Sequence, residues 1–189
     1  MKIMRLTVFM ALLCLFLTAQ TQDLGQKVYY NDEGPINIAV DAAVASRLID
    51  SPYVMFWLYM GADENVSAQV NRENVILVFN NQEYAMASFD ELRDNYDQDR
   101  RDLNIYARQG KQSLVTSYLR FYTFQWDLDF FPARFENVTR VDEGGFSSTV
   151  GFATKAYFKN PGFKTGDQIA IKVFDKKNRE IWGAVAAVL

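Results

Sequence analysis

Two residue types that often carry catalysis or bind metals are scarce in this sequence. Histidine is absent, and cysteine occurs once, as Cys14. Without histidine the chain cannot form a Ser-His-Asp triad, a histidine proton shuttle or a metal site built on imidazole. Cys14 lies in an N-terminal segment that we expect to be removed, so disulfides, catalytic thiols and cysteine-based zinc sites are excluded as well. We therefore expect no catalytic residue, no metal ion and no cofactor.

The N-terminus has the layout of a secretory signal peptide. Lys2 and Arg5 precede an apolar segment at 6–17, and polar residues follow it. This segment is shorter than the ~20 apolar residues that cross a bilayer as a helix. We expect cleavage after Ala19, which makes residues 1–19 the signal peptide.

Cys14 raises the alternative of a lipid-modified N-terminus. Lipid attachment needs a small residue directly before the cysteine, whereas Leu13 stands there, and we do not expect this modification. Beyond the signal peptide the longest apolar run is Tyr53–Met60, which is too short for a transmembrane helix. The protein is therefore expected to be exported, either to the periplasm or to the medium.

The exported chain shows a pattern of short strands separated by turns. Residues 20–35 are polar and are expected to form a leader, followed by a single domain at 36–189. The unbroken apolar run Tyr53–Met60 predicts a central strand covered on both faces, and Asn80-Asn81 predicts a hairpin turn. Alternating or apolar segments predict further strands at 36–44, 75–79, 83–86, 122–130, 150–158, 169–173 and 181–189. Their number and spacing predict an all-β, immunoglobulin-like antiparallel β-sandwich with one inserted α-helix.

The inserted helix is expected near 88–108. Ser88 and Glu91 have the spacing of a capping box, and apolar side chains then recur at helical intervals. The carboxylates of this segment lack the ligand spacing and the glycine of an EF-hand loop, so a calcium site is not expected. The arginines among them favour a solvated face of ion pairs. For 111–120 the pattern leaves helix and strand open.

The segment after this helix is rich in aromatic side chains. Alternation from Tyr122 to Phe130 predicts a strand with an apolar face in the core, and with Asp127 and Asp129 on its polar face about 7 Å apart. Two carboxylates at such a distance occur in glycosidases, but two acids on one strand are usually its solvated face, and a catalytic pair is not expected here. The residues expected at a binding surface are Trp126, Phe131 and Phe135.

The order of elements from Tyr53 to Met86 carries a resemblance. An apolar strand is followed by a polar connection containing Asn71-Arg72-Glu73-Asn74, then by Val-Ile-Leu-Val-Phe and Asn-Asn-Gln-Glu-Tyr. This order resembles that of immunoglobulin-like extracellular domains of bacterial envelope proteins and lipoproteins, and Tyr157–Gln168 is compatible with the closing strands of such a domain. The resemblance covers about half of the exported chain and implies a noncatalytic envelope module.

These observations lead to one expected function and one alternative. The chain is expected to be an exported, non-catalytic binding module whose partner is a protein or an envelope polymer, and nucleic acid is not expected as a partner of an acidic exported protein. The alternative is a carbohydrate-binding module, which needs at least two coplanar surface rings among Trp57, Trp126, Trp182 and Tyr122. Asn65 and Asn137 fit the glycosylation sequon and matter only in a eukaryotic host.

Overall fold

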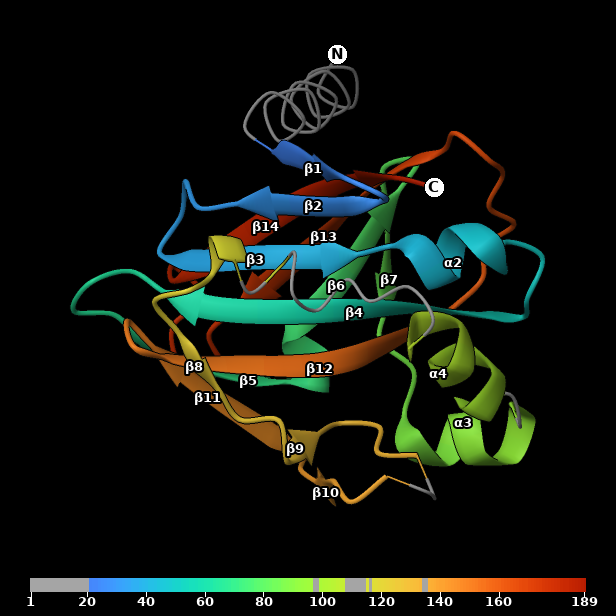
Figure 1. Cartoon of the computed structure of the whole chain (residues 1–189). Coiled ribbons are helices and arrows are strands. Elements are labelled where there is room, and N and C mark those ends of the chain that lie inside the picture. The colour runs from blue at the N-terminus through green and yellow to red at the C-terminus, as the bar shows by residue number, and fades with distance from the viewer. Residues whose placement is uncertain (1–20, 97–98, 108–114, 116, 134–135) are drawn as a thin grey trace, which may run out of the picture.

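Two larger β-sheets, one behind the other, dominate the structure (Figure 1). It is a computed structural model and describes residues 21–96, 99–107, 115, 117–133 and 136–189. The first sheet has six strands, in the spatial order β1 (Gln22–Gly25), β2 (Val28–Asn31), β3 (Ile36–Asp41), β4 (Tyr53–Ala62), β12 (Val150–Lys159) and β8 (Thr123–Phe124). The second has four, in the order β14 (Trp182–Val188), β13 (Gln168–Phe174), β6 (Val75–Phe79) and β7 (Gln82–Ala85). The predicted all-β sandwich is confirmed.

The core lies between these two sheets because alternate residues of each strand point inward. Phe56 and Leu58 of β4 are fully buried, as are Leu77 of β6 and Ile171 of β13, and all belong to one hydrophobic cluster. β4 pairs with β3 on one side and β12 on the other, which places it in the middle of its sheet, as its apolar run predicts. Trp57 is the one residue of β4 that is only partly buried.

Smaller elements complete the sandwich at its edges. β5 (Ser67–Asn71) pairs antiparallel with β11 (Glu143–Ser147), and β9 (Leu128–Asp129) pairs parallel with β10 (Thr139–Arg140). A 3-10 turn, η1, spans Arg72–Asn74. Among the described residues, the helices with complete bounds are α2 (Ala43–Arg47), α3 (Phe89–Asn95) and α4 (Asp99–Ala107), and Val115, Ser117 and Tyr118 are also helical. None of the helices in the described parts of the chain has the length and apolar character that crossing a bilayer would need.

Two boundaries differ from the sequence prediction. The predicted leader 20–35 contributes β1 and β2, which extend the six-stranded sheet beyond β3, since Val28, Tyr29 and Tyr30 are buried against it. The helix predicted near 88–108 is present as two helices, and the first ends where Tyr96 adopts an extended backbone. The predicted Ser88–Glu91 capping box is confirmed at the start of α3. The predicted signal peptide and the segment 108–114 lie outside the described residues.

The strand predicted from Tyr122 to Phe130 is wrong. Only the short strands β8 and β9 form there, with a turn at Trp126 and Asp127 between them. This stretch crosses the outer face of the six-stranded sheet, which is the face turned away from the four-stranded sheet, and β8 meets the edge of β12 for two residues only (Figure 1). Tyr122, Phe124 and Trp126 alternate because their rings pack onto that face, with Phe124 edge to face against Tyr59, whereas Phe130 is buried in the core between the sheets.

The hairpin turn predicted between β6 and β7 is confirmed. Asn80 and Asn81 both have positive φ angles, 49° and 62°, which type I′ turns require and asparagine tolerates. Asn65 and Asn137, the two sequon residues, are both exposed.

Candidate functional site

A pocket of about 340 Å³ opens on the outer face of the six-stranded sheet, next to α4; we call it the Trp126 pocket. Two strands supply its floor, with Trp57 from β4 and Ala153 from β12. Its walls come from α4 and from the segment around β9. The wall residues are Leu103, Asn104, Tyr106, Trp126, Leu128, Asp129, Glu136 and Val138. Residues from five separate parts of the chain therefore meet here.

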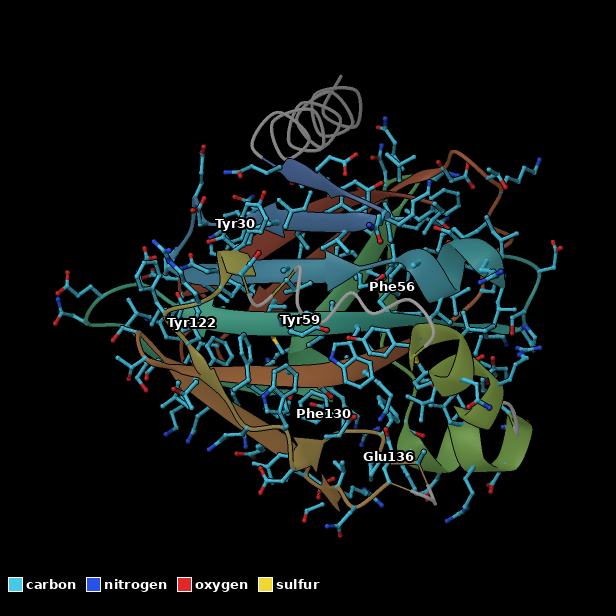
Figure 2. The ribbon with its side chains drawn as sticks, viewed as in Figure 1. Tyr30, Phe56, Tyr59, Tyr122, Phe130 and Glu136 are labelled. Atoms are coloured by element: carbon cyan, nitrogen blue, oxygen red, sulfur yellow. The ribbon has the colours of Figure 1, made fainter. Side chains whose placement is uncertain are left out.

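Aromatic rings form much of this lining. Trp57 and Tyr106 stack in parallel, with centroids 4.5 Å apart and an interplanar angle of 9°. Trp126 meets Tyr59 edge to face at 6.2 Å and remains 41% exposed. Figure 2 shows Tyr59 in the middle of this face, with Tyr122 beside it. Trp126 is therefore the open aromatic surface of the pocket, whereas Trp57 is already covered by Tyr106.

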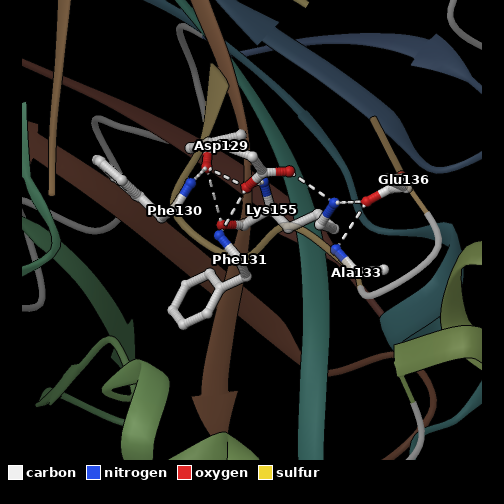
Figure 3. A network of polar contacts seen from close by, with 7 residues as sticks. Asp129, Phe130, Phe131, Ala133, Glu136 and Lys155 are labelled. Carbon is white, nitrogen blue, oxygen red and sulfur yellow. Dashed lines mark hydrogen bonds and ion pairs between the residues drawn. The ribbon is translucent and has the colours of Figure 1, made fainter. Parts of the chain in front are cut away.

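A buried ion network lies beside the floor (Figure 3). Lys155 of β12 is only 1% exposed, and its Nζ lies 2.6 Å from Asp129 Oδ2 and 2.7 Å from Glu136 Oε2. Lys155 is the direct neighbour of Trp57 across the β12–β4 pair, so its ammonium also lies 5.0 Å from the centre of the Trp57 ring. A buried cation needs such partners, because an unpaired charge in the interior is strongly destabilising.

Asp129 also completes the hydrogen bonding of the sheet edge. Its Oδ1 accepts hydrogen bonds from the Lys155 and Phe131 backbone N–H groups and from the Thr154 hydroxyl. Within the described parts of the chain, β12 has no strand partner at Lys155 on this side, since β8 pairs only with Val150 and Gly151. The carboxylate therefore takes the place of a neighbouring strand for an edge N–H group that would otherwise be buried and unpaired.

Two tyrosine hydroxyls meet behind the aromatic wall. Tyr59 and Tyr106 are hydrogen-bonded to each other through their hydroxyl oxygens. Burial raises the pKa of Tyr106 to about 12, against a weaker opposing effect of the hydrogen bond with Tyr59. Burial raises the pKa of Tyr59 further, and the neighbouring Tyr106 adds to this shift.

These pKa shifts predict a loss of stability at high pH. The unfolded chain ionises Tyr106 near pH 10, whereas the folded chain holds the proton up to about pH 12. The stabilising contribution is complete below pH 10 and is lost as the pH rises through 12. Between pH 9 and pH 12 the free energy of unfolding should fall by ~2 kcal/mol less in Tyr106→Phe than in the unmodified protein. Urea unfolding at several pH values measures this, and equal slopes in both proteins would contradict it.

The residues predicted for a binding surface have different environments. Trp126 lies at the pocket and is exposed, as predicted. Phe131 is 5% exposed, so its prediction as a surface residue is wrong: its N–H donates to Asp129, which turns the chain inward, and its ring packs on Tyr157 at 5.4 Å. Phe135 lies outside the described residues. Trp182 is exposed on β14 of the other sheet, so it cannot form one platform with Trp126.

Asp127 and Asp129 do not lie together on one polar strand face, contrary to the sequence prediction. Asp127 is exposed in the turn before β9, and Asp129 is buried and bonded to Lys155. On the helices, Arg93 forms surface ion pairs with Asp90 and Asp94, both at 3.0 Å, and the pair with Asp90 has the predicted i,i+3 spacing. Asp97, for which a pair with Arg101 is predicted, lies outside the described residues. Asp102, predicted on the same solvated face, is instead buried and accepts a hydrogen bond from the Tyr96 hydroxyl.

Sequence reasoning missed Lys155 and Glu136. The available signal was a lysine in the middle of the apolar strand Phe152–Phe158, since a charged residue at such a position needs a partner. No local pattern indicated which carboxylates would supply it. Among the described residues, no group of three or more histidine, cysteine, aspartate or glutamate side chains is arranged to hold a metal ion.

A second pocket, of about 530 Å³, lies between the end of α2 and the helices α3 and α4. Arg101, Tyr96 and Ser51 line it, but they bond to one another: the Arg101 guanidinium donates to the Tyr96 hydroxyl at 3.0 Å, and this hydroxyl lies 3.1 Å from Ser51 Oγ. Burial raises the pKa of Tyr96 to about 12. These groups satisfy one another, which makes this pocket the weaker candidate.

Comparisons of the chain with protein-family models, with curated proteins and with solved structures found no match. The Trp126 pocket is therefore interpreted from its own geometry.

Proposed function

We propose that this protein is an exported, non-catalytic binding module and that its ligand occupies the Trp126 pocket. The observation that supports this most directly is an exposed tryptophan at a preformed pocket whose floor is stiffened by buried ion pairs. Pockets lined by aromatic side chains with a few placed polar groups are typical of small-ligand sites. Rigid lining also favours binding, because little conformational entropy is lost when the ligand enters.

The chemistry of the polar groups favours binding over catalysis. A general acid or base must be free to exchange a proton with a substrate. Asp129 is buried and accepts four hydrogen bonds or ion-pair contacts, from Phe131, Thr154 and twice from Lys155. Lys155 is paired with two carboxylates at once. Groups engaged in this way hold the pocket together, and nothing in their arrangement supplies an activated nucleophile.

Export is supported by the N-terminal sequence, with its basic start, its apolar segment and the polar residues after Ala19. A partner would then be a component of the envelope or of the extracellular space. The resemblance of the strand order to immunoglobulin-like envelope domains agrees with this proposal.

Replacing Trp126 by alanine is expected to abolish ligand binding. A thermal-shift screen of the purified protein against soluble cell-wall fragments, oligosaccharides and short peptides provides the measurement. A ligand at a hundredfold over its dissociation constant stabilises the folded state by ~2.7 kcal/mol, which raises the midpoint by roughly 5–10 °C in a domain of this size. The shift should disappear with Trp126→Ala, because its ring is the open surface of the pocket.

The matched control is Trp182→Ala, since Trp182 is similarly exposed, at 39%, but lies on the other sheet. This variant should keep the full shift. A shift that survives Trp126→Ala and disappears with Trp182→Ala would place the binding site on the other sheet and contradict the proposal.

A further inference from the structure

We infer that the ligand of the Trp126 pocket is a neutral sugar ring, held by stacking on Trp126 and by hydrogen bonds to Asn104 and Glu136. This inference rests on the proposed function and names the ligand class of the same site. The pocket does not have the two coplanar surface rings expected for a flat sugar platform, because the ring stacked in parallel with Trp57 is Tyr106, and neither Trp182 nor Tyr122 lines it. The inferred site instead uses the single exposed ring of Trp126 together with polar side chains.

Charge in the pocket disfavours charged ligands of either sign. The carboxylates of Asp129 and Glu136 repel an anion, and the network of one ammonium and two carboxylates carries a net negative charge. The Lys155 ammonium lies 2.6 Å from Asp129 Oδ2 and 2.7 Å from Glu136 Oε2, so among the described residues that line the pocket only Glu136 Oε1 is left to pair with a ligand cation. A cation would in addition meet the repulsion of that ammonium. A neutral ligand meets neither cost.

The polar atoms at the pocket that are not engaged in the ion network are suited to hydroxyl groups, which both donate and accept hydrogen bonds. Glu136 uses Oε2 for Lys155 and for the Ala133 N–H, so Oε1 remains an acceptor, and its side chain is 23% exposed. Asn104 is exposed at the wall and offers a donor and an acceptor. Donors and acceptors thus occur together around one small space.

The remaining surface suits the C–H face of a sugar. Trp126 packs on Phe124 and Tyr59 and keeps much of its surface open. A pyranose presents a largely apolar face of axial C–H groups to such a ring and directs its hydroxyls to the sides. One open ring flanked by Asn104 and Glu136 matches that division between an apolar face and a polar rim.

Saturation-transfer NMR on the purified protein tests the inference. The neutral sugars are the disaccharides cellobiose, maltose, lactose and chitobiose. Glucuronate, glucosamine and choline serve as charged probes, and short neutral peptides serve as probes of another ligand class. We expect transfer to the ring protons of at least one neutral sugar and at least about tenfold weaker binding of the charged probes. Trp126→Ala and Asn104→Ala should each weaken the sugar about tenfold or more. Asn104 is an exposed helical position, so its variant keeps the test valid if Trp126→Ala fails to fold. Trp182→Ala should leave the affinity unchanged.

The outcomes separate this inference from the proposed function. If choline or a peptide binds in a Trp126-dependent manner and no neutral sugar does, the sugar inference is wrong and the proposed function stands. If no probe of any class binds at Trp126, both are wrong. Sugar binding that is insensitive to both Trp126→Ala and Asn104→Ala would also overturn the inference, since the sugar would then lie elsewhere.

Discussion

Replacing Lys155 by methionine is expected to lower the free energy of unfolding by about 3–5 kcal/mol. Methionine fills a similar volume but leaves Asp129 buried with its Oδ2 unpaired, because Lys155 is the only partner of that oxygen in the described structure. Glu136 contributes less to the loss, since its side chain is partly exposed and can turn to water. Urea unfolding monitored by tryptophan fluorescence measures the change.

Two further variants test whether the loss of stability comes from the buried ion pair. Lys172→Met removes an ion pair at the surface, where Nζ lies 3.6 Å from a Glu83 side chain that is mostly exposed, and should cost less than about 1 kcal/mol. Adding Asp129→Asn to Lys155→Met should recover part of the lost stability, because the amide oxygen still accepts from Phe131 and Thr154 and no charge remains buried. If Lys155→Met is no more destabilising than Lys172→Met, the ion network does not have the role we assign to it.

Replacing Gly183 by alanine is expected to destabilise the protein by about 3 kcal/mol or more, since the two sheets touch backbone to backbone at this point. A Cβ at Gly183 on β14 would overlap the carbonyl oxygen of Ile36 on β3 and lie 3.0 Å from its carbonyl carbon. A backbone group in a sheet cannot move aside as a flexible side chain can, so the sheets would have to separate locally. Thermal unfolding should show a midpoint lower by roughly 6–12 °C.

Gly145→Ala provides the matched control for this prediction. Gly145 also lies in a strand, β11, but a Cβ there has no neighbour within 4 Å and its φ is not positive. Its replacement should be neutral or stabilising by up to ~1 kcal/mol, because alanine reduces the entropy of the unfolded chain. If both glycine variants destabilise to the same extent, strand propensity rather than contact between the sheets would account for Gly183.

Local patterns were sufficient for several elements of this fold. The capping box at Ser88, the apolar run that became β4 and the turn at Asn80-Asn81 all depend on residues close together in the sequence, and all three are confirmed. β1 and β2 were missed because the polar residues around them outweigh the short apolar stretch at Val28–Tyr30. This stretch becomes buried through tertiary contacts, with Tyr29 in the core between the sheets and Val28 and Tyr30 in the cluster on the outer face. The long aromatic strand was predicted wrongly because rings that cover a sheet face at intervals produce the same alternation as a strand.

In the candidate site, too, local sequence patterns predict some features and tertiary contacts decide others. Trp126 could be predicted as a binding residue because it stands near a chain break in an aromatic segment, and it does lie exposed at a pocket. Phe131 has the same local environment in the sequence and is buried. What distinguishes them is tertiary packing: the Phe131 ring packs on Tyr157 in the core, whereas Trp126 lies in a turn on the outer face of the sheet.

The sequence by itself determined the class of fold, the absence of histidine chemistry, and several strand and turn positions, since composition and short-range periodicity carry that information. Only the tertiary structure decided that Lys155 pairs with Asp129 and Glu136 beside Trp57. These residues come from separate strands and loops, and they meet because β12 lies next to β4 while the segment around β9 folds over both. Such contacts between distant parts of the chain follow from how the sheets pack, and no local pattern contains them.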